Sequence, residues 1–138
     1  MKILGLDIGK ARIGVATCDE LQILASGLET IYSKSLTKDV LKIVEIVNKY
    51  NIKTVVVGLP LQMNGEEGEM SKYVRLFCSK LQEQVNVDII FQDERLSSIE
   101  AQEYLHYSAT KKTKKKQVLD QIAASIILQR YLDRNKEK

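Results

Sequence analysis

The sequence predicts an α/β fold in which a mixed five-stranded sheet, with three antiparallel strands followed by two parallel ones, is flanked by helices. Three short apolar segments separated by turn residues fill the first 32 positions. Two later apolar segments each follow a helical pattern, as expected for parallel strands joined by crossovers. The 138 residues, 44% of them hydrophobic, are expected to form one domain over residues 1–138 with a core that needs no disulfide.

The amino-terminal strands are predicted at residues 2–8, 12–17 and 27–32. The first two are joined by the short turn Gly9-Lys10-Ala11, which favours a hairpin. Apolar residues then recur at helical spacing over 36–50, which predicts an amphipathic helix. Residues 53–58 (KTVVVG) are a β-branched run without polar alternation, and this pattern is typical of a strand covered on both faces.

The only proline and two further glycines follow this strand, so residues 58–70 are predicted to be a loop. The next helix is expected to reach about Val85, because Val74, Phe77 and Leu81 recur at helical spacing. A short buried strand is then expected at 87–91.

The last third of the chain is predicted to be mainly helical. Ser97 followed by Glu100 is a capping-box pattern, which predicts a helix up to about residue 107. The lysine-rich stretch 108–116 is predicted to be a mobile loop, and residues 117–133 are predicted to form the closing helix.

Composition argues against several classes of site. Cys18 and Cys78 lie sixty positions apart without a second Cys or a His at metal-ligand spacing, so both are expected to be buried apolar side chains. The only histidine, His106, leaves little basis for a zinc site or for histidine acid–base chemistry. The apolar start of the chain is too short for a signal or a membrane span, so a cytoplasmic location without membrane contact is expected.

Three acids stand where an α/β sheet places ligands. Asp7 interrupts an apolar strand at its carboxyl end, and the alternative is a turn-forming aspartate. Asp120 is predicted in the first turn of a helix whose alanines would let it approach the sheet closely, and the alternative is helix capping. Glu94 follows the last strand beside Asp93, and the alternative is a surface acid pair neutralised by Arg95.

Carboxylates from three distant parts of the chain predict a shared metal site. Hard oxygen ligands of this type suit Mg²⁺ or Mn²⁺ rather than zinc. Two such ions about 4 Å apart can activate water and stabilise the leaving oxygen of a phosphodiester. Asp7, Glu94 and Asp120 are therefore the candidate catalytic residues and metal ligands of a hydrolase that needs no histidine.

Four blocks of the sequence resemble, in order and spacing, the YqgF family of Holliday-junction resolvases and ribosomal RNA maturation nucleases. They are DIGKARIGVA (7–16), VVGLPLQMNG (56–65), DERLSS (93–98) and DQIAASIILQRYL (120–132). The resemblance implies a ribonuclease H-like fold and an acidic site of Asp7, Glu94 and Asp120, assisted by Asp93. It also implies a role in maturing the 5′ end of 16S ribosomal RNA or, by fold analogy, in cleaving branched DNA.

Two positions depart from the patterns of this fold and family. Classical resolvases place an acid at the end of the fourth strand, where this chain has Gly58-Leu59-Pro60. The fifth strand should lie about 10 Å from the first, so Glu94 must lean inward to share a metal with Asp7, and the site is expected to form fully only with substrate. Asn64 stands where an Asp is common in the family and is not counted as a ligand.

Basic residues supply the candidate contacts to a nucleic-acid backbone. Five lysines fall within the six positions 111–116, and the substrate-binding candidates among them are Lys112, Lys114 and Lys115. The candidates closer to the acids are Lys10, Arg12 and Arg95. No aromatic residues interleave with the lysines, so base stacking is not predicted.

Other functions fit parts of the sequence. A catalytically silent RNA-binding ribosome-assembly factor would keep the acids for structure, and cleavage by the purified protein separates it from a nuclease. Residues 7–16 also look like the first phosphate loop of actin-like ATPases and sugar kinases, but those enzymes need two such domains around the nucleotide. A weak homodimer would match the two equivalent strands of a junction, although the sequence shows no clear dimer seam.

Overall fold

The computed structural model describes residues 3–62, 64–93 and 112–136, together with their side chains except those of 112–117 and 136. The described elements, in chain order, are β1 (Ile3–Ile8), β2 (Arg12–Cys18), β3 (Ala25–Tyr32), α1 (Leu36–Tyr50), β4 (Thr54–Leu59), α2 (Glu69–Gln84), β5 (Asp88–Asp93) and α4 (Lys112–Lys136). The helix predicted up to residue 107 lies outside the described residues.

The strands form a five-stranded mixed sheet in the order β3-β2-β1-β4-β5. β2 pairs antiparallel with both β1 and β3, whereas β4 pairs parallel with both β1 and β5. This arrangement confirms the predicted fold class, with three antiparallel strands followed by two parallel ones. The carboxyl ends of β1, β3, β4 and β5 therefore meet at one edge of the sheet.

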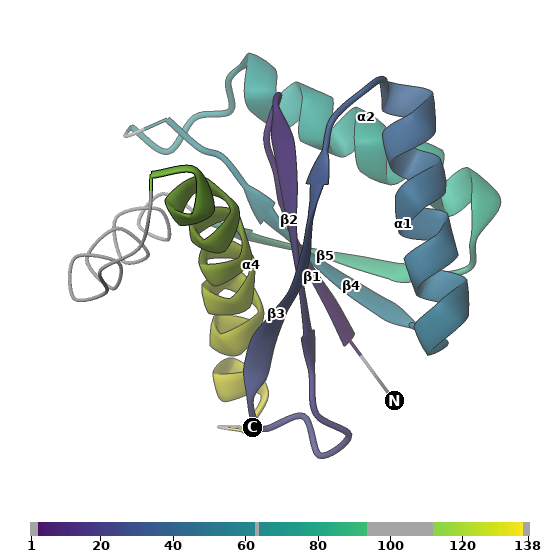
Figure 1. Cartoon of the computed structure of the whole chain (residues 1–138), viewed down its shortest axis with the longest axis vertical. Coiled ribbons are helices and arrows are strands. Elements are labelled where there is room, and N and C mark those ends of the chain that lie inside the picture. Colours follow the sequence, from purple (N-terminus) through teal and green to yellow (C-terminus); the bar gives the residue numbers. More distant parts are fainter. Residues whose placement is uncertain (1–2, 63, 94–111, 137–138) are drawn as a thin grey trace.

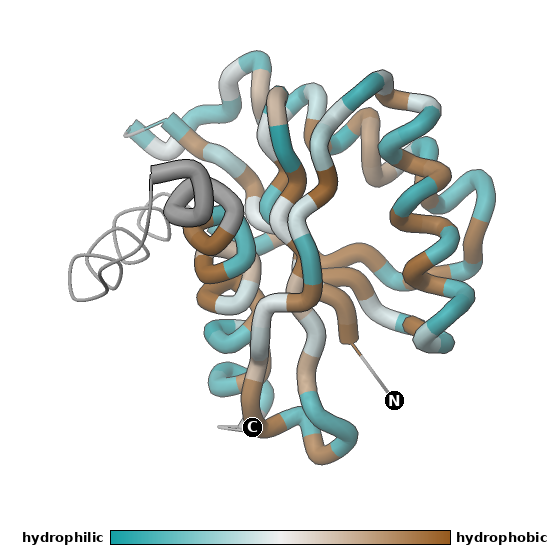
Figure 2. The backbone as a smooth tube through the Cα atoms, viewed as in Figure 1, coloured by the Kyte–Doolittle hydropathy of each residue, from teal (hydrophilic) through white to brown (hydrophobic). Residues whose placement is uncertain are grey.

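Helices cover both faces of the sheet (Figure 1). α1 and α2 pack on one face against a cluster that includes Leu4, Leu6 and Phe77, and α4 packs on the other face. Figure 2 shows hydrophobic residues gathered along the strands and along parts of the helices. Every residue of β4 after the first is buried, which confirms the prediction of a strand covered on both faces.

α4 lies unusually close to the sheet. It contacts β1, β2, β3 and β4, and its buried residues are small or apolar. A Cβ atom placed on Gly5 of β1 would lie 2.8 Å from the Cβ of Leu128 and 3.0 Å from the backbone oxygen of Ala124. Gly5 and Ala124 thus allow the close approach that the alanines of this helix predicted.

The lysine-rich stretch differs from its prediction. α4 begins at Lys112 and ends at Lys136, so the expectation of a loop through residue 116 is wrong for residues 112–116. Lysine is a good helix former, and the buried part of α4 extends the same helix into this polar segment. Asp120 accordingly lies about two turns inside the helix, and the explanation of Asp120 as a first-turn cap is wrong.

Strand limits differ only slightly from expectation. β5 continues to Asp93 rather than residue 91, because Gly58 pairs with Gln92 and Leu59 with Asp93. β3 begins at Ala25, two residues earlier than predicted, because it pairs with β2 as far as Cys18. Among the described helices, none combines the length and the apolar character that a membrane span requires.

Candidate active site

Asp7 lies near the carboxyl end of β1, on the face that α4 covers. Side chains alternate along a strand, and Ile3 of the same strand belongs to the cluster packed against α4. Asp7 is half-buried, whereas its neighbours Leu6 and Ile8 are buried on the opposite face. Asp7 therefore occupies the edge of the sheet where the parallel strands end.

Asp120 lies above the strand next to Asp7. Asp7 pairs with Gly14 of β2, and a Cβ atom on Gly14 would meet the backbone oxygen of Asp120 at 2.0 Å and its Cβ at 3.1 Å. Gly14 is thus the cross-strand partner of Asp7, and Asp120 packs directly against it. The structure brings these two predicted site residues to the same region of one face.

Arg12 forms an ion pair with one of the two acids. Its Nε donates to Oδ2 of Asp120 at 2.6 Å, and the two side chains are 29% and 17% exposed. Arg12 lies two residues before Gly14 on β2, so both belong to the same face of the sheet. The sequence predicted Arg12 only as a phosphate contact, and its pairing with Asp120 was not foreseen.

The other predicted site residues lie in the turn after β1, in α4, at the end of β5 or outside the described residues. Lys10 is exposed in the turn between β1 and β2. The first turns of α4 contain Lys112, Lys114 and Lys115. Glu94 and Arg95 lie outside the described residues. Asp93 is exposed at the end of β5, where strand alternation puts it on the face opposite Gln92.

Gln92 is a buried polar residue to which the sequence analysis gave no role. Its side chain is 6% exposed, and no hydrogen-bond partner is found for its Nε2 atom among the residues that the structure describes. It pairs with Gly58, and it lies on the α4 face because Ile90, two residues earlier, packs against the α4 cluster. An amide in an otherwise apolar strand is the signal that could have identified it.

The segment after β4 is held in a defined conformation. Leu61 and Glu67 form an antiparallel bridge, and Gln62 N donates to Glu66 O at 2.8 Å. Asn64 Oδ1 accepts from Glu66 N at 2.9 Å, so this side chain takes part in the turn.

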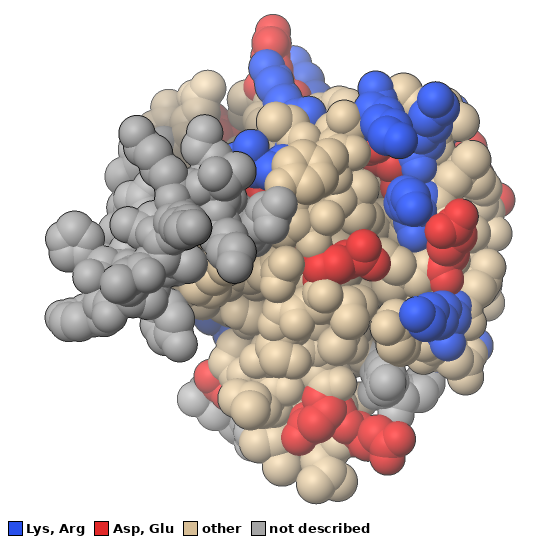
Figure 3. Space-filling model, viewed as in Figure 1, with Lys and Arg blue, Asp and Glu red and all other residues tan. Residues whose placement is uncertain are grey.

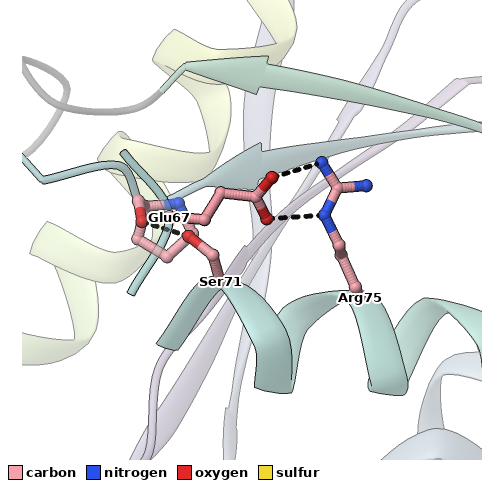
Figure 4. A network of polar contacts seen from close by, with 4 residues as sticks. Glu67, Ser71 and Arg75 are labelled. Atoms are coloured by element: carbon pink, nitrogen blue, oxygen red, sulfur yellow. Dashed lines mark hydrogen bonds and ion pairs between the residues drawn. The ribbon is translucent and has the colours of Figure 1, made fainter. Parts of the chain in front are cut away.

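The same segment is tied to α2 by side chains (Figure 4). Arg75 donates from Nε and Nη2 to the two carboxylate oxygens of Glu67, at 2.6 and 3.0 Å. This pairing lowers the pKa of Glu67. Ser71 Oγ donates to the carbonyl oxygen of Pro60, and the Arg75 guanidinium stacks 4.8 Å from the centre of the Phe91 ring. The contacts fix the chain beside the carboxyl end of β4, next to that of β1.

The two cysteines are buried and free, as predicted. Burial raises the pKa of the Cys78 thiol to about 12, so Cys78 is protonated at neutral pH. A protonated thiol is a weak nucleophile and a weak ligand, so its side chain serves the core. In the described part of the chain, no group of three or more His, Cys, Asp and Glu residues is arranged to hold a metal ion. Glu94, the third predicted ligand, is not in that part.

Residues 1–134 match the sequence model of the RuvX family, which is described as "Holliday junction resolvase". The chain belongs to the RuvX family. RuvX corresponds to the YqgF family named in the sequence analysis, so that resemblance is confirmed. This RuvX member is 44% identical over 137 residues to a protein of Caldanaerobacter subterraneus subsp. tengcongensis named "Putative pre-16S rRNA nuclease", with 99% of each chain covered. A Thermoanaerobacter pseudethanolicus protein of the same name is 43% identical over 139 residues, with 100% of each chain covered.

Solved structures show the fold of this RuvX member. Thermus thermophilus RuvC superposes with a TM-score of 0.62 at 10% identity, covering 99% of this chain and 97% of RuvC. The fowlpox virus resolvase in complex with Holliday junction DNA gives 0.56 at 15% identity, covering 98% and 99% of the two chains. The fold is therefore ribonuclease H-like, as predicted, and the family assignment makes the protein a nuclease. Resolvase-like nucleases generally use divalent metal ions.

Proposed function

We propose that this protein hydrolyses phosphodiester bonds with Mg²⁺ or Mn²⁺, and that its substrate is the 5′ region of the 16S ribosomal RNA precursor. One observation carries the proposal: Asp120 lies over Gly14, the cross-strand partner of Asp7. Two carboxylates from positions far apart in the sequence thus share one region of the sheet edge. The names of the relatives support an RNA substrate, and branched DNA is the second candidate because of the resolvase structures.

The donor set fits a hard divalent cation. Asp7 and Asp120 offer carboxylate oxygens, the ligands that Mg²⁺ and Mn²⁺ prefer, and Glu94 is the proposed third ligand. A bound ion would supply positive charge that stabilises the leaving oxygen and lowers the pKa of water. Arg12 orients the Asp120 carboxylate and offers its remaining N–H donors to a phosphate oxygen. Lys10 and Arg95 are proposed to contact neighbouring phosphates, and Asp93 to assist Glu94.

The start of α4 is the proposed surface for the nucleic-acid backbone. Lys112, Lys114 and Lys115 fall within its first turns, and the chain leads from them directly to Asp120. The face in Figure 3 gives a contrast, because basic side chains over α1 are interspersed with acidic ones. A mixed surface attracts a polyanion weakly, whereas clustered lysines neutralise successive phosphates.

The packing of the helices on one sheet supports residues 1–138 as a single nuclease domain. The two hydrophobic clusters lie on the two faces of the same sheet, so α1, α2 and α4 share one scaffold. We also propose that the protein forms a weak homodimer and is located in the cytoplasm.

Replacing Asp7 by Asn tests the proposed function. Purified parent and Asp7→Asn proteins are incubated with precursor RNA and with four-way DNA, in Mg²⁺ and in Mn²⁺. The exchange keeps the size of the side chain but removes its charge, so cleavage should fall at least about a hundredfold while nucleic-acid binding remains. Without metal, the variant should melt at the same temperature or higher, and it should gain less from Mn²⁺ than the parent.

Asp88→Asn is the matched control, because Asp88 is exposed at the opposite end of β5 from the proposed site. It should cleave like the parent. A parent that binds RNA but cleaves no RNA or DNA in either metal would instead establish the alternative function, a silent RNA-binding ribosome-assembly factor.

A further inference from the structure

The buried amide of Gln92 lies in the same row of the sheet as Asp7. The parallel pairing of β1 with β4 extends to Leu6 and Val57, and Asp7 and Gly58 are the next residues along the two strands. Gly58 pairs in turn with Gln92 of β5. The row on the α4 face therefore reads Asp7, Gly58, Gln92.

Gly58 contributes no side chain to this row. Two strand spacings separate Asp7 from Gln92 by about 10 Å, and the residue between them has no side chain. Gly65 is the only glycine with a positive φ angle in the described residues, so the backbone at position 58 does not itself require glycine. Glycine at position 58 thus leaves the row without a side chain between the carboxylate of Asp7 and the amide of Gln92.

An unsatisfied donor at Gln92 needs a physical explanation. Nε2 is shielded from solvent, and within the described structure it donates to no acceptor. Buried polar groups in proteins nearly always have a partner, and exceptions often mark a missing water, an ion or a catalytic role. An apolar residue of similar size would avoid the free-energy cost of burying a donor without an acceptor. The amide is therefore expected to have a partner in the working protein.

We propose that Gln92 is a positioning residue of the nuclease, whose Nε2 donates a hydrogen bond to the attacking water over Gly58, between Gln92 and Asp7. This inference rests on the proposed function, because the water must be the one that hydrolyses the phosphodiester near Asp7. The hydrogen bond orients a lone pair of the water towards phosphorus without taking up its proton. In the proposed arrangement Gln92 acts through the water and binds neither the phosphate nor the metal.

Gln92→Met tests the inference, because Met is unbranched and of similar size but cannot donate. The metal-free variant should melt at the same temperature as the parent or higher, since a buried unsatisfied group is removed. Its kcat should fall about 10- to 100-fold, as for other residues that orient groups in metal sites. KM should stay within about twofold, because ground-state binding does not involve the lost hydrogen bond.

Gln82→Met is the matched control. Gln82 in α2 is an exposed glutamine whose Nε2 does have a partner, the carbonyl oxygen of the buried Val87 at 3.2 Å. Its replacement should lower the melting temperature and leave kcat unchanged. A second variant, Gly58→Ala, puts a methyl group between Asp7 and Gln92, where the proposed water lies, and it should reduce kcat with little change in KM.

The outcomes separate this inference from the proposed function. If the parent cleaves and Gln92→Met cleaves equally well, only the inference on Gln92 fails. If Gln92→Met melts lower, as Gln82→Met should, Gln92 is a structural residue and the inference fails whatever happens to kcat. If the parent never cleaves, the proposed function fails and this inference with it.

Discussion

The backbone oxygen of Asp120 lies so close to Gly14 that a Cβ atom at position 14 would approach it to 2.0 Å. Because Gly14 is also the strand partner of Asp7, a backbone contact sets how far the two acids lie from each other. Protein interiors are densely packed, so a displacement at such a contact is transmitted to the neighbouring residues. The geometry of the proposed site therefore depends on a residue that has no side chain.

Gly14→Ala should disrupt both stability and the site. The added methyl group collides with helix backbone, which cannot move without displacing α4, so we expect a loss of about 3 kcal/mol and a strong loss of cleavage. Gly27→Ala is the control under the same helix, because its Cβ would meet side-chain atoms of Gln121, at 2.8 Å, and no backbone. Urea unfolding should show a smaller loss for Gly27→Ala, and equal losses would contradict the assigned role of Gly14.

Arg12→Gln should increase the affinity for Mn²⁺. The guanidinium lies 2.6 Å from Asp120, and a nearby cation disfavours the approach of a second one. Loss of this partly exposed pair should cost about 1 kcal/mol or less in stability. Calorimetric titration with Mn²⁺ checks the affinity, and a weaker Mn²⁺ affinity in Arg12→Gln would rule out competition between Arg12 and the metal.

Arg75→Gln is the matched control for that experiment. Arg75 pairs with Glu67 at the same 2.6 Å, but from α2, on the face of the sheet opposite α4. Its loss should leave the affinity for Mn²⁺ unchanged. The Glu67 pKa is lowered in the folded state, so the stabilisation by this pair is present above the ordinary value of 4.5 and is lost as the pH falls below it.

Replacing Lys112, Lys114 and Lys115 together by Ala should weaken nucleic-acid binding and reduce its salt dependence. Each lysine that neutralises a phosphate adds close to one unit to the slope of log K against log salt. The control variant replaces three lysines that are exposed on α1 and α2, Lys42, Lys49 and Lys72, by Ala. The two triple variants therefore have the same net charge. Binding titrations at several salt concentrations should separate the two triples, and identical slopes would remove α4 from the interface.

Alkaline pH should destabilise the fold partly through Cys78. Its pKa is raised by burial from the ordinary 9.0 to about 12, so the folded state keeps the proton longer than the unfolded state. The stabilisation is therefore complete below about pH 9 and is lost progressively as the pH rises towards 12. Urea unfolding from pH 7 to 10.5 should show a shallower decline for Cys78→Ala than for the parent.

Tyr73 adds to the same decline. Burial, with the charge of Asp39, raises its pKa above 10.0, so its contribution has the same sign and begins at higher pH. Cys78→Ala should accordingly reduce the pH dependence without abolishing it. A parent whose stability is constant through this range would contradict both assignments.

Local patterns in the sequence were enough to determine the elements and their order. The hairpin of β1 and β2, the amphipathic α1 and the continuous apolar run of β4 depend on residues close together in the chain. Asp7 could be predicted as a site residue because an acid inside an apolar strand is a local anomaly. The limits of α4 could not, since helix propensity in a lysine-rich segment depends on what the rest of the helix packs against.

Tertiary structure alone decided which residues meet. Arg12 and Asp120 are 108 positions apart, and no local pattern indicates that they form an ion pair. The burial of Gln92 likewise results from the pairing of β5 with β4 and from the cover on the α4 face. Periodicity and turn chemistry act over a few residues, whereas these contacts arise only when α4 packs against the finished sheet and brings distant backbone within reach.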